Sequence, residues 1–217
     1  MNSFFGRLGS VLAVASTAPA FADVAFTTGS MVEVFAPYSF VTGENESSSA
    51  IAILDEGLTL LPSDVELNVY TPGTHGDNPP PYLIVPAGTL VQTYLVHFDP
   101  TGTSFATLTG SVVFEPGEVI IGLQTHTPLL YVTDPLVGHP LATYPAVFDD
   151  FRGFETLPGP DSVTLPLTMA SASFTLFAEL GVDHARIFTI PVPSPSTLAA
   201  VMSVGALGAI RRRRDAV

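Results

Sequence analysis

The chain has no cysteine, no tryptophan and no lysine. Without cysteine there are no disulfides or thiolate metal sites, so the fold depends on its hydrophobic core. Arginine supplies every cation, and between residues 23 and 192 only Arg152 and Arg186 stand against nineteen carboxylates, a formal net charge of −17. Nucleic acids and anionic lipids are bound mainly through Lys and Arg. The composition therefore excludes a nucleic-acid partner.

The N-terminus has the features of a secretory signal peptide. One cation, Arg7, precedes an apolar run over residues 8–15, and the small-x-small pattern Ala20-Phe21-Ala22 follows. Charge, apolar run and small-residue site come in the order that export requires. We predict a signal peptide over residues 1–22, removed by signal peptidase, rather than a buried N-terminal helix.

The C-terminus combines an apolar segment with the largest cluster of positive charge. Residues 198–210 carry no charge, and four arginines follow at once: Arg211, Arg212, Arg213 and Arg214. A helix of about fifteen residues is roughly 22 Å long, short of the roughly 30 Å hydrocarbon core. Clustered arginine holds a chain end on the cytoplasmic side of the membrane. We predict a transmembrane helix within a tail of residues 192–217.

This tail resembles the PEP-CTERM sorting signal of bacteria with a Gram-negative-type envelope. The resemblance runs from Val192 to Arg214 and includes the short motif Pro193, Ser194, Pro195, Ser196 and Thr197. Ser194 stands where the family has a glutamate. The resemblance implies that an exosortase-type enzyme removes the tail, which holds the protein in the membrane until then. It places the protein in the cell envelope, on the cell surface or in the extracellular matrix.

The middle of the chain, residues 23–191, reads as one domain of short strands. Period-two alternation recurs in 64–70, 162–168 and 173–180, which is typical of strands with one buried face. The segments 89–98 and 119–126 are more continuously apolar, as central strands are. Turns rich in Pro and Gly separate these runs, and we find no convincing helical periodicity. We expect an all-β fold, an antiparallel β-sandwich of jelly-roll-like form.

This middle region is also similar to an uncharacterised extracellular module that precedes PEP-CTERM tails. The similarity rests on five short stretches and names no activity. They are Glu56 to Leu60, Pro86 to Thr89, Val91 to Gly102, Leu108 to Glu115 and Arg152 to Glu155.

Candidate chemical sites are sparse. The five histidines, at positions 75, 97, 126, 139 and 184, are widely separated, and His97 and His126 are interpreted as core or strand-end residues rather than metal ligands. Asp149, Asp150 and Glu155 surround Arg152, which suggests an ion pair with a neighbouring carboxylate, a Ca²⁺ site or a paired-carboxylate glycosidase. The ion pair is preferred, because arginine competes with a cation. Weaker acidic groups lie at 44–46 and 55–57.

The sequence favours a binding or structural role over catalysis. It contains no phosphate-binding glycine loop, HExxH helix or GxSxG turn, so we assign no catalytic, cofactor-binding or metal residue and expect no enzyme. The resemblance places the protein in exopolysaccharide, with a structural or interactive role. A carbohydrate-binding module and a polysaccharide-active enzyme remain as alternatives, although Phe outnumbers Tyr fifteen to six and fills cores more often than sugar sites.

Overall fold

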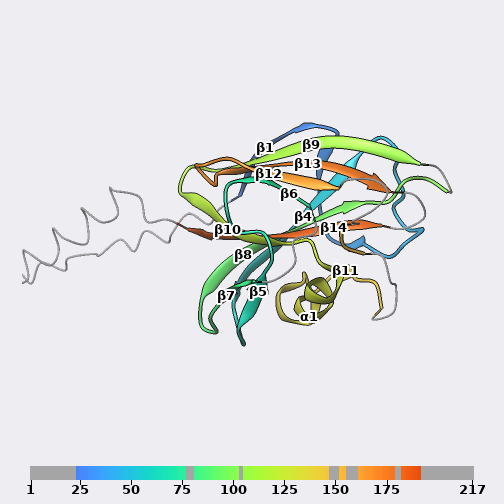
Figure 1. Cartoon of the computed structure of the whole chain (residues 1–217). Helices are drawn as coiled ribbons and strands as arrows, with labels where there is room; N and C mark the ends of the chain where they lie inside the picture. Colours follow the sequence, from blue (N-terminus) through green and yellow to red (C-terminus); the bar gives the residue numbers. More distant parts are fainter. Residues whose placement is uncertain are drawn as a thin grey trace, which may run out of the picture.

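A computed structural model describes residues 23–76, 81–102, 105–146, 152–154, 161–178 and 182–191 (Figure 1). The signal peptide and the sorting tail that the sequence predicts lie outside these ranges. Within them, no helix is both long enough and apolar enough to cross a membrane.

Two five-stranded sheets form the body of the domain. The first sheet is antiparallel and has the order β1 (Val24–Gly29), β9 (Ala106–Phe114), β13 (Ser171–Ala178), β12 (Ser162–Leu165) and β6 (Gly73–His75). The second sheet has the order β10 (Glu118–Gln124), β14 (Asp183–Pro191), β8 (Leu90–Phe98), β4 (Ile51–Leu60) and β2 (Met31–Val34). Its pairs are antiparallel except β2 with β4, which is parallel.

The main core lies between these two sheets. Ile53, Val96 and Ile187 of the second sheet form one buried cluster with Phe174 and Leu176 of the first sheet. In β13 every second residue is buried, as the alternation in the sequence predicts. Each large apolar side chain removed from water contributes about 1.5–3 kcal/mol. The all-β class is therefore confirmed. The alternating apolar residues of the strands supply the buried faces that hold the two sheets together.

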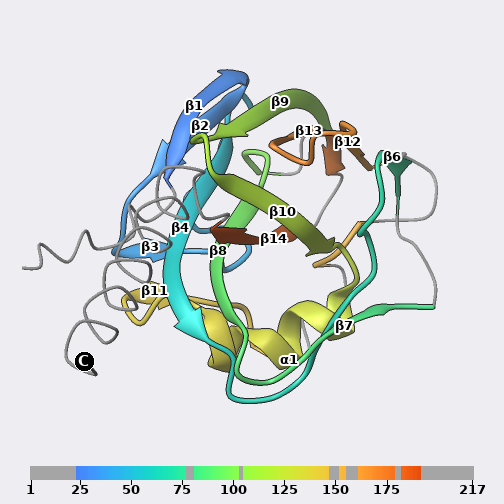
Figure 2. The same ribbon diagram turned by 90° about the vertical axis from the view of Figure 1, so that its left-hand side faces the viewer.

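Smaller elements cover the outer face of the second sheet. They are the helix α1 (Thr127–Val137), the parallel pair β3 (Tyr38–Ser39) with β11 (Ala142–Thr143), and the antiparallel pair β5 (Val65–Leu67) with β7 (Leu83–Val85). Figures 1 and 2 show them on the side of β8 and β14 that faces away from the first sheet. Phe40 and Leu130 pack there against Leu54 and Leu95. A partial third layer thus buries a second face of the sheet.

The helix corrects the expectation of a helix-free domain. α1 contains Pro128 in its first turn and Pro135 in its interior, and both prolines interrupt the pattern by which a helix is recognised. Its buried residues, Leu129, Leu130, Thr133 and Val137, nevertheless lie on one face. Burial of this face against the sheet offsets the poor helix propensity.

Two strand predictions also need correction. The apolar segment 119–126 contributes β10, which is an edge strand rather than a central one, although Val69 bridges to its Leu123 and covers that edge. Leu167, predicted on the buried face with Val163 and Leu165, is 89% exposed. The strand β12 ends at Leu165, because Pro166 and the following turn take the chain out of the sheet. The segment 89–98 forms β8, which is central as predicted.

Candidate functional site

Both arginines of the domain are fully buried on the outer face of the second sheet. Arg186, in β14, donates from Nε and Nη2 to the two carboxylate oxygens of Glu56 at 2.7 and 2.8 Å. Its Nη2 also donates to Asp134 at 2.8 Å, and its Nη1 donates to Thr133 at 2.7 Å. Burial alone lowers the pKa of Arg186, but Glu56 and Asp134 raise it above its ordinary value. Arg186 therefore stays charged inside the fold.

Arg152 completes the same network from a different segment. Its Nη1 and Nη2 both donate to the carboxylate of Asp134, the latter at 2.9 Å. Its guanidinium also lies 5.2 Å from the centre of the Tyr131 ring. Two arginines thus face two carboxylates, Glu56 and Asp134, and the four charges balance. A buried charge group of this kind is tolerated only when its members are paired and hydrogen-bonded.

Local structure brings each partner to this group. Glu56 is the extra residue of a β-bulge in β4, between Asp55 and Gly57, and Gly57 has the positive φ of 98° that such a bend requires. Asp134 comes from α1, directly before Pro135. The Tyr144 hydroxyl adds a hydrogen bond of 2.7 Å to Glu56. Burial and the Glu56 charge raise the pKa of Tyr144. The Tyr144 hydroxyl therefore stays protonated and can act as the donor in this hydrogen bond.

Within the described residues, Arg152 pairs with a carboxylate that is 18 residues away in the sequence. The sequence suggested Asp149, Asp150 or Glu155, which lie outside the described residues, whereas the structure pairs Arg152 with Asp134 of the helix. Among the residues that the structure describes, no group of three His, Asp or Glu side chains is placed to hold a metal ion. The motif of Pro193, Ser194, Pro195, Ser196 and Thr197 and the arginines at 211–214 also lie outside the described part of the chain.

Two histidines that are distant in the sequence meet beside Arg152. His97 of β8 and His184 of β14 are directly opposite in the ladder, and His97 Nδ1 lies 2.7 Å from His184 Nε2. Arg152 Nε donates to His184 Nδ1 at 2.7 Å. The positions of His97 and His184 in the sequence do not predict that the two rings meet. The sequence feature that could have suggested the contact is that both histidines lie inside apolar strands.

The hydrogen-bond directions follow from the arginine. Burial, with the Arg152 charge second, lowers the pKa of His97 to about 3, and the same two causes, again in that order, are the largest in lowering that of His184. Both rings are therefore neutral, and each carries one proton. His184 Nδ1 accepts from Arg152, so its proton is on Nε2 and is donated to His97 Nδ1. His97 must then carry its own proton on Nε2.

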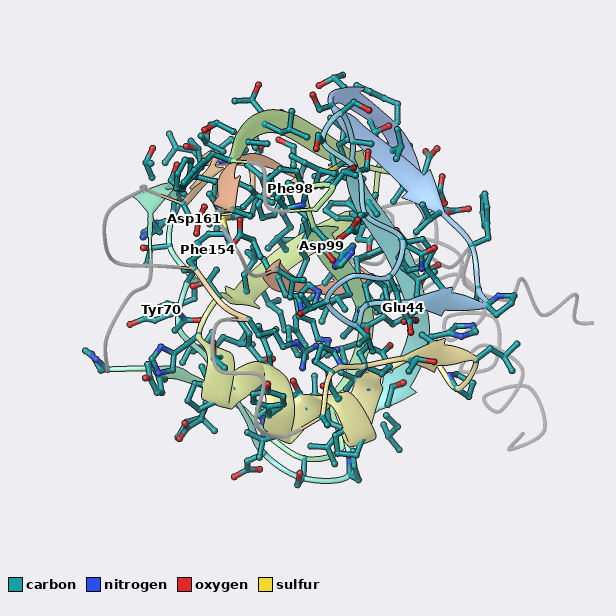
Figure 3. The ribbon with its side chains drawn as sticks, turned by 90° about the vertical axis from the view of Figure 1, so that its right-hand side faces the viewer. Glu44, Tyr70, Phe98, Asp99, Phe154 and Asp161 are labelled. Carbon is teal, nitrogen blue, oxygen red and sulfur yellow. The ribbon has the colours of Figure 1, made fainter. Side chains whose placement is uncertain are left out.

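That last N–H belongs to a ring at the edge of a cavity. The cavity has a volume of about 330 Å³ and lies under the loop of residues 41–50. Its apolar lining is Val32, Val34, Ala50 and Ala52, and its polar lining is Tyr38, Asn45, Glu46, Ser47, His97 and Asp99. Figure 3 labels Phe98 and Asp99 at the end of β8, and Glu44 in this loop. The volume is at the lower end of the range for small-molecule sites, about 300–1,000 Å³.

The remaining histidines have local roles. His75 Nε2 lies 2.8 Å from the Thr71 carbonyl oxygen, and His139 Nδ1 accepts from Leu141 N–H at 3.1 Å. His126 lies two residues after the end of β10 and is the N-cap residue of α1, so it follows the strand that the sequence predicted it to end. His97 is confirmed as a core residue, with the cavity as an addition that the sequence did not predict. The acidic groups at 44–46 and 55–57 contribute Glu46 to the cavity and Glu56 to the charge network.

No family model, no curated protein and no solved structure matches the chain.

Proposed function

We propose that this is an exported surface protein, released from the membrane by removal of its C-terminal tail, with a structural or interactive role in exopolysaccharide. Signal peptidase and an exosortase-type enzyme are its processing partners. Its destination is the envelope, surface or extracellular matrix of a Gram-negative-type bacterium. We assign the two-sheet body to the jelly-roll-like sandwiches, and we propose no catalytic activity.

The observation that carries this proposal is where the folded body begins and ends. β1 begins at Val24, the second residue after the predicted signal cleavage, and β14 ends at Pro191, directly before the predicted tail of residues 192–217. Both predicted cuts fall outside the described strands. Removal of the two ends would therefore leave every described strand and its hydrogen bonds intact.

The charge distribution supports an extracellular role. Both arginines between residues 23 and 192 are buried, so no lysine or arginine of the body lies on its surface. The surface is acidic, which keeps the protein soluble and away from anionic lipid. Its attachment to the membrane before processing would then depend on the tail alone.

Intact mass spectrometry of surface material from the native host tests the proposal. The expected mature species begins at Asp23 and ends before the apolar segment. A mature chain that retains Arg211 to Arg214 would make the tail a permanent anchor. In that case Ser194→Glu, which restores the glutamate of the family, should produce cleavage; an uncleaved Ser194→Glu chain would refute the sorting interpretation.

Carbohydrate binding is the second candidate function, and the cavity beside His97 favours it. It presents hydrogen-bonding groups from Glu46, His97 and Asp99 next to an apolar wall. Pull-down with a panel of polysaccharides tests it, and release of reducing sugar would instead indicate an enzyme.

A further inference from the structure

His97, one of the residues that line the cavity, has a hydrogen-bond donor that the protein itself does not use. His97 is 2% exposed, and its Nε2 has no hydrogen-bond partner within the described part of the chain. The relay from Arg152 through His184 fixes the proton on this atom. A buried N–H without an acceptor is unfavourable by about 1–3 kcal/mol, unless a ligand or water supplies the acceptor. The site therefore calls for an acceptor atom from outside.

Two carboxylates of the cavity, those of Asp99 and Glu46, each accept, within the described residues, a backbone hydrogen bond on one oxygen only. Asp99 Oδ2 accepts the Gly43 N–H at 2.7 Å, and Glu46 Oε2 accepts the Gly102 N–H at 3.2 Å. These backbone bonds fix both groups, and the second oxygen of each has no partner among the described residues. Two acceptors thus accompany the His97 donor. Burial, and then the Asp99 charge, raise the pKa of Tyr38, so its phenol stays protonated at the same wall.

This set of groups selects against charged ligands. Asp99 and Glu46 repel anions. Among the described residues no group of three His, Asp or Glu side chains is placed to hold a metal ion, and a cation that prefers nitrogen ligands would need the lone pair of His97 Nε2, where the proton is. An uncharged ligand with hydroxyl groups both donates to carboxylates and accepts from an N–H. The apolar wall of Val32, Val34 and Ala52 suits the C–H face of such a ligand.

We propose that the cavity binds one neutral sugar unit, with His97 Nε2–H donating to a sugar oxygen and with Asp99 and Glu46 accepting from its hydroxyls. This inference deepens the carbohydrate-binding function proposed above and names its site and ligand class. Arg152 and His184 are positioning residues, because they hold the proton on the outer nitrogen of His97. With a pKa of about 3, His97 acts as a fixed donor and not as an acid or base.

The test is a ¹⁵N NMR titration of the histidine rings in the full chain, kept in mild detergent. Glucose, galactose and mannose are the neutral probes, and glucuronate and Ca²⁺ are the charged ones. We expect the Nε2–H form of His97 before any addition, and a saturable shift of that signal with at least one neutral sugar. An Nδ1–H form, no shift with any neutral sugar, or a larger shift with Ca²⁺ or glucuronate would each overturn the proposal.

Conservative variants connect the signal to the cavity. Asp99→Asn keeps an oxygen for the Gly43 N–H but replaces an acceptor by a donor, and should weaken sugar binding about tenfold or more. Glu46→Gln, at an exposed position, should act in the same direction. Asp64→Asn is the matched control, because Asp64 is exposed and also accepts a backbone N–H, that of Ala87 at 2.8 Å. Unchanged affinity in Asp99→Asn and Glu46→Gln would refute the site.

The outcomes separate this site from the broader function. If polysaccharide retains the wild-type and Asp99→Asn chains equally, the surface role stands and the cavity proposal fails. If sugar shifts His97 in a chain that the host never processes, the cavity proposal stands and the sorting proposal fails.

Discussion

The substitution Glu56→Gln tests the buried charge network most directly. The side chain of Glu56 is fully buried and forms an ion pair with Arg186. It accepts three short hydrogen bonds, two from Arg186 and one from Tyr144. Glutamine has the same shape but only one oxygen. Its NH₂ group must face an N–H or O–H donor, and the network is left with two arginines against Asp134 alone.

The size of the effect follows from these contacts. At least one hydrogen bond to a charged group is lost, at about 1.5–3 kcal/mol, and a positive charge remains buried without a partner. Breaking a buried ion pair on one side is unfavourable by roughly 3–5 kcal/mol. We expect the free energy of unfolding to fall by about 3–5 kcal/mol, a large share of the roughly 5–15 kcal/mol of a typical domain.

Urea unfolding followed by circular dichroism measures this loss. With an m-value of about 2 kcal/mol/M, the midpoint should fall by about 1.5–2.5 M. Glu66→Gln is the matched control, because Glu66 is an exposed glutamate of β5, and its effect should stay within about 0.5 kcal/mol. A loss in Glu56→Gln no larger than that of the control would refute the network.

A double-mutant cycle separates charge balance from lost packing. Arg186→Met combined with Glu56→Gln removes one charge of each sign and leaves Arg152 paired with Asp134. The double variant should therefore be less destabilised than the sum of the two single variants, by about 0.5–3 kcal/mol. Strict additivity would show that Arg186 and Glu56 do not interact.

Three further predictions concern pH, packing and ions. The folded-state pKa of His97 is depressed to about 3 and that of His184 is also lowered, so the stability that the neutral rings contribute should be full above the unfolded value near 6.5 and should fall with acid by about 1.4 kcal/mol per pH unit for each ring. Glu118 has a pKa raised to about 7, mainly by burial, and opposes this loss between about 4.5 and 7, so Glu118→Gln should steepen the acid loss in urea titrations across that range. Gly110→Ala would place a Cβ 2.7 Å from the Met31 Cβ and should reduce stability in urea unfolding by roughly 1–3 kcal/mol. Millimolar Ca²⁺ should raise the melting temperature relative to EDTA at matched ionic strength, because divalent cations relieve the repulsion among the carboxylates. An equal effect of Mg²⁺ would indicate screening, and no effect of either ion would contradict the prediction. A Ca²⁺-specific effect that is lost in Asp150→Asn would indicate a site near Arg152.

The strands were predictable because burial on one face leaves a period-two record in the sequence. Val65 with Leu67, and Phe174 with Leu176, are buried as that period requires. The helix α1 was not predictable in the same way. Its prolines conceal the period, and its stability comes from a sheet face that is assembled from distant strands.

The charge network was predictable only in part. The sequence favoured an ion pair between Arg152 and a carboxylate, and the structure contains one, with Asp134; the sequence predicted no partner for Arg186. The partners were not predictable, because Glu56 and Asp134 are separated from Arg186 by 130 and 52 residues. Their meeting depends on strand order and on the bulge at Gly57, which local sequence does not specify.

The network also explains how a third layer can be attached to this sheet and still leave an open cavity. The apolar contacts of Phe40, Leu54, Leu95 and Leu130 alone would allow α1 to slide on the sheet. Directional bonds from Arg186 to Thr133 and Asp134 fix one position of the helix. Arg152, held by the same Asp134, then sets the proton of His184 and through it that of His97. The charges that hold the layer thus also determine what the cavity presents to a ligand.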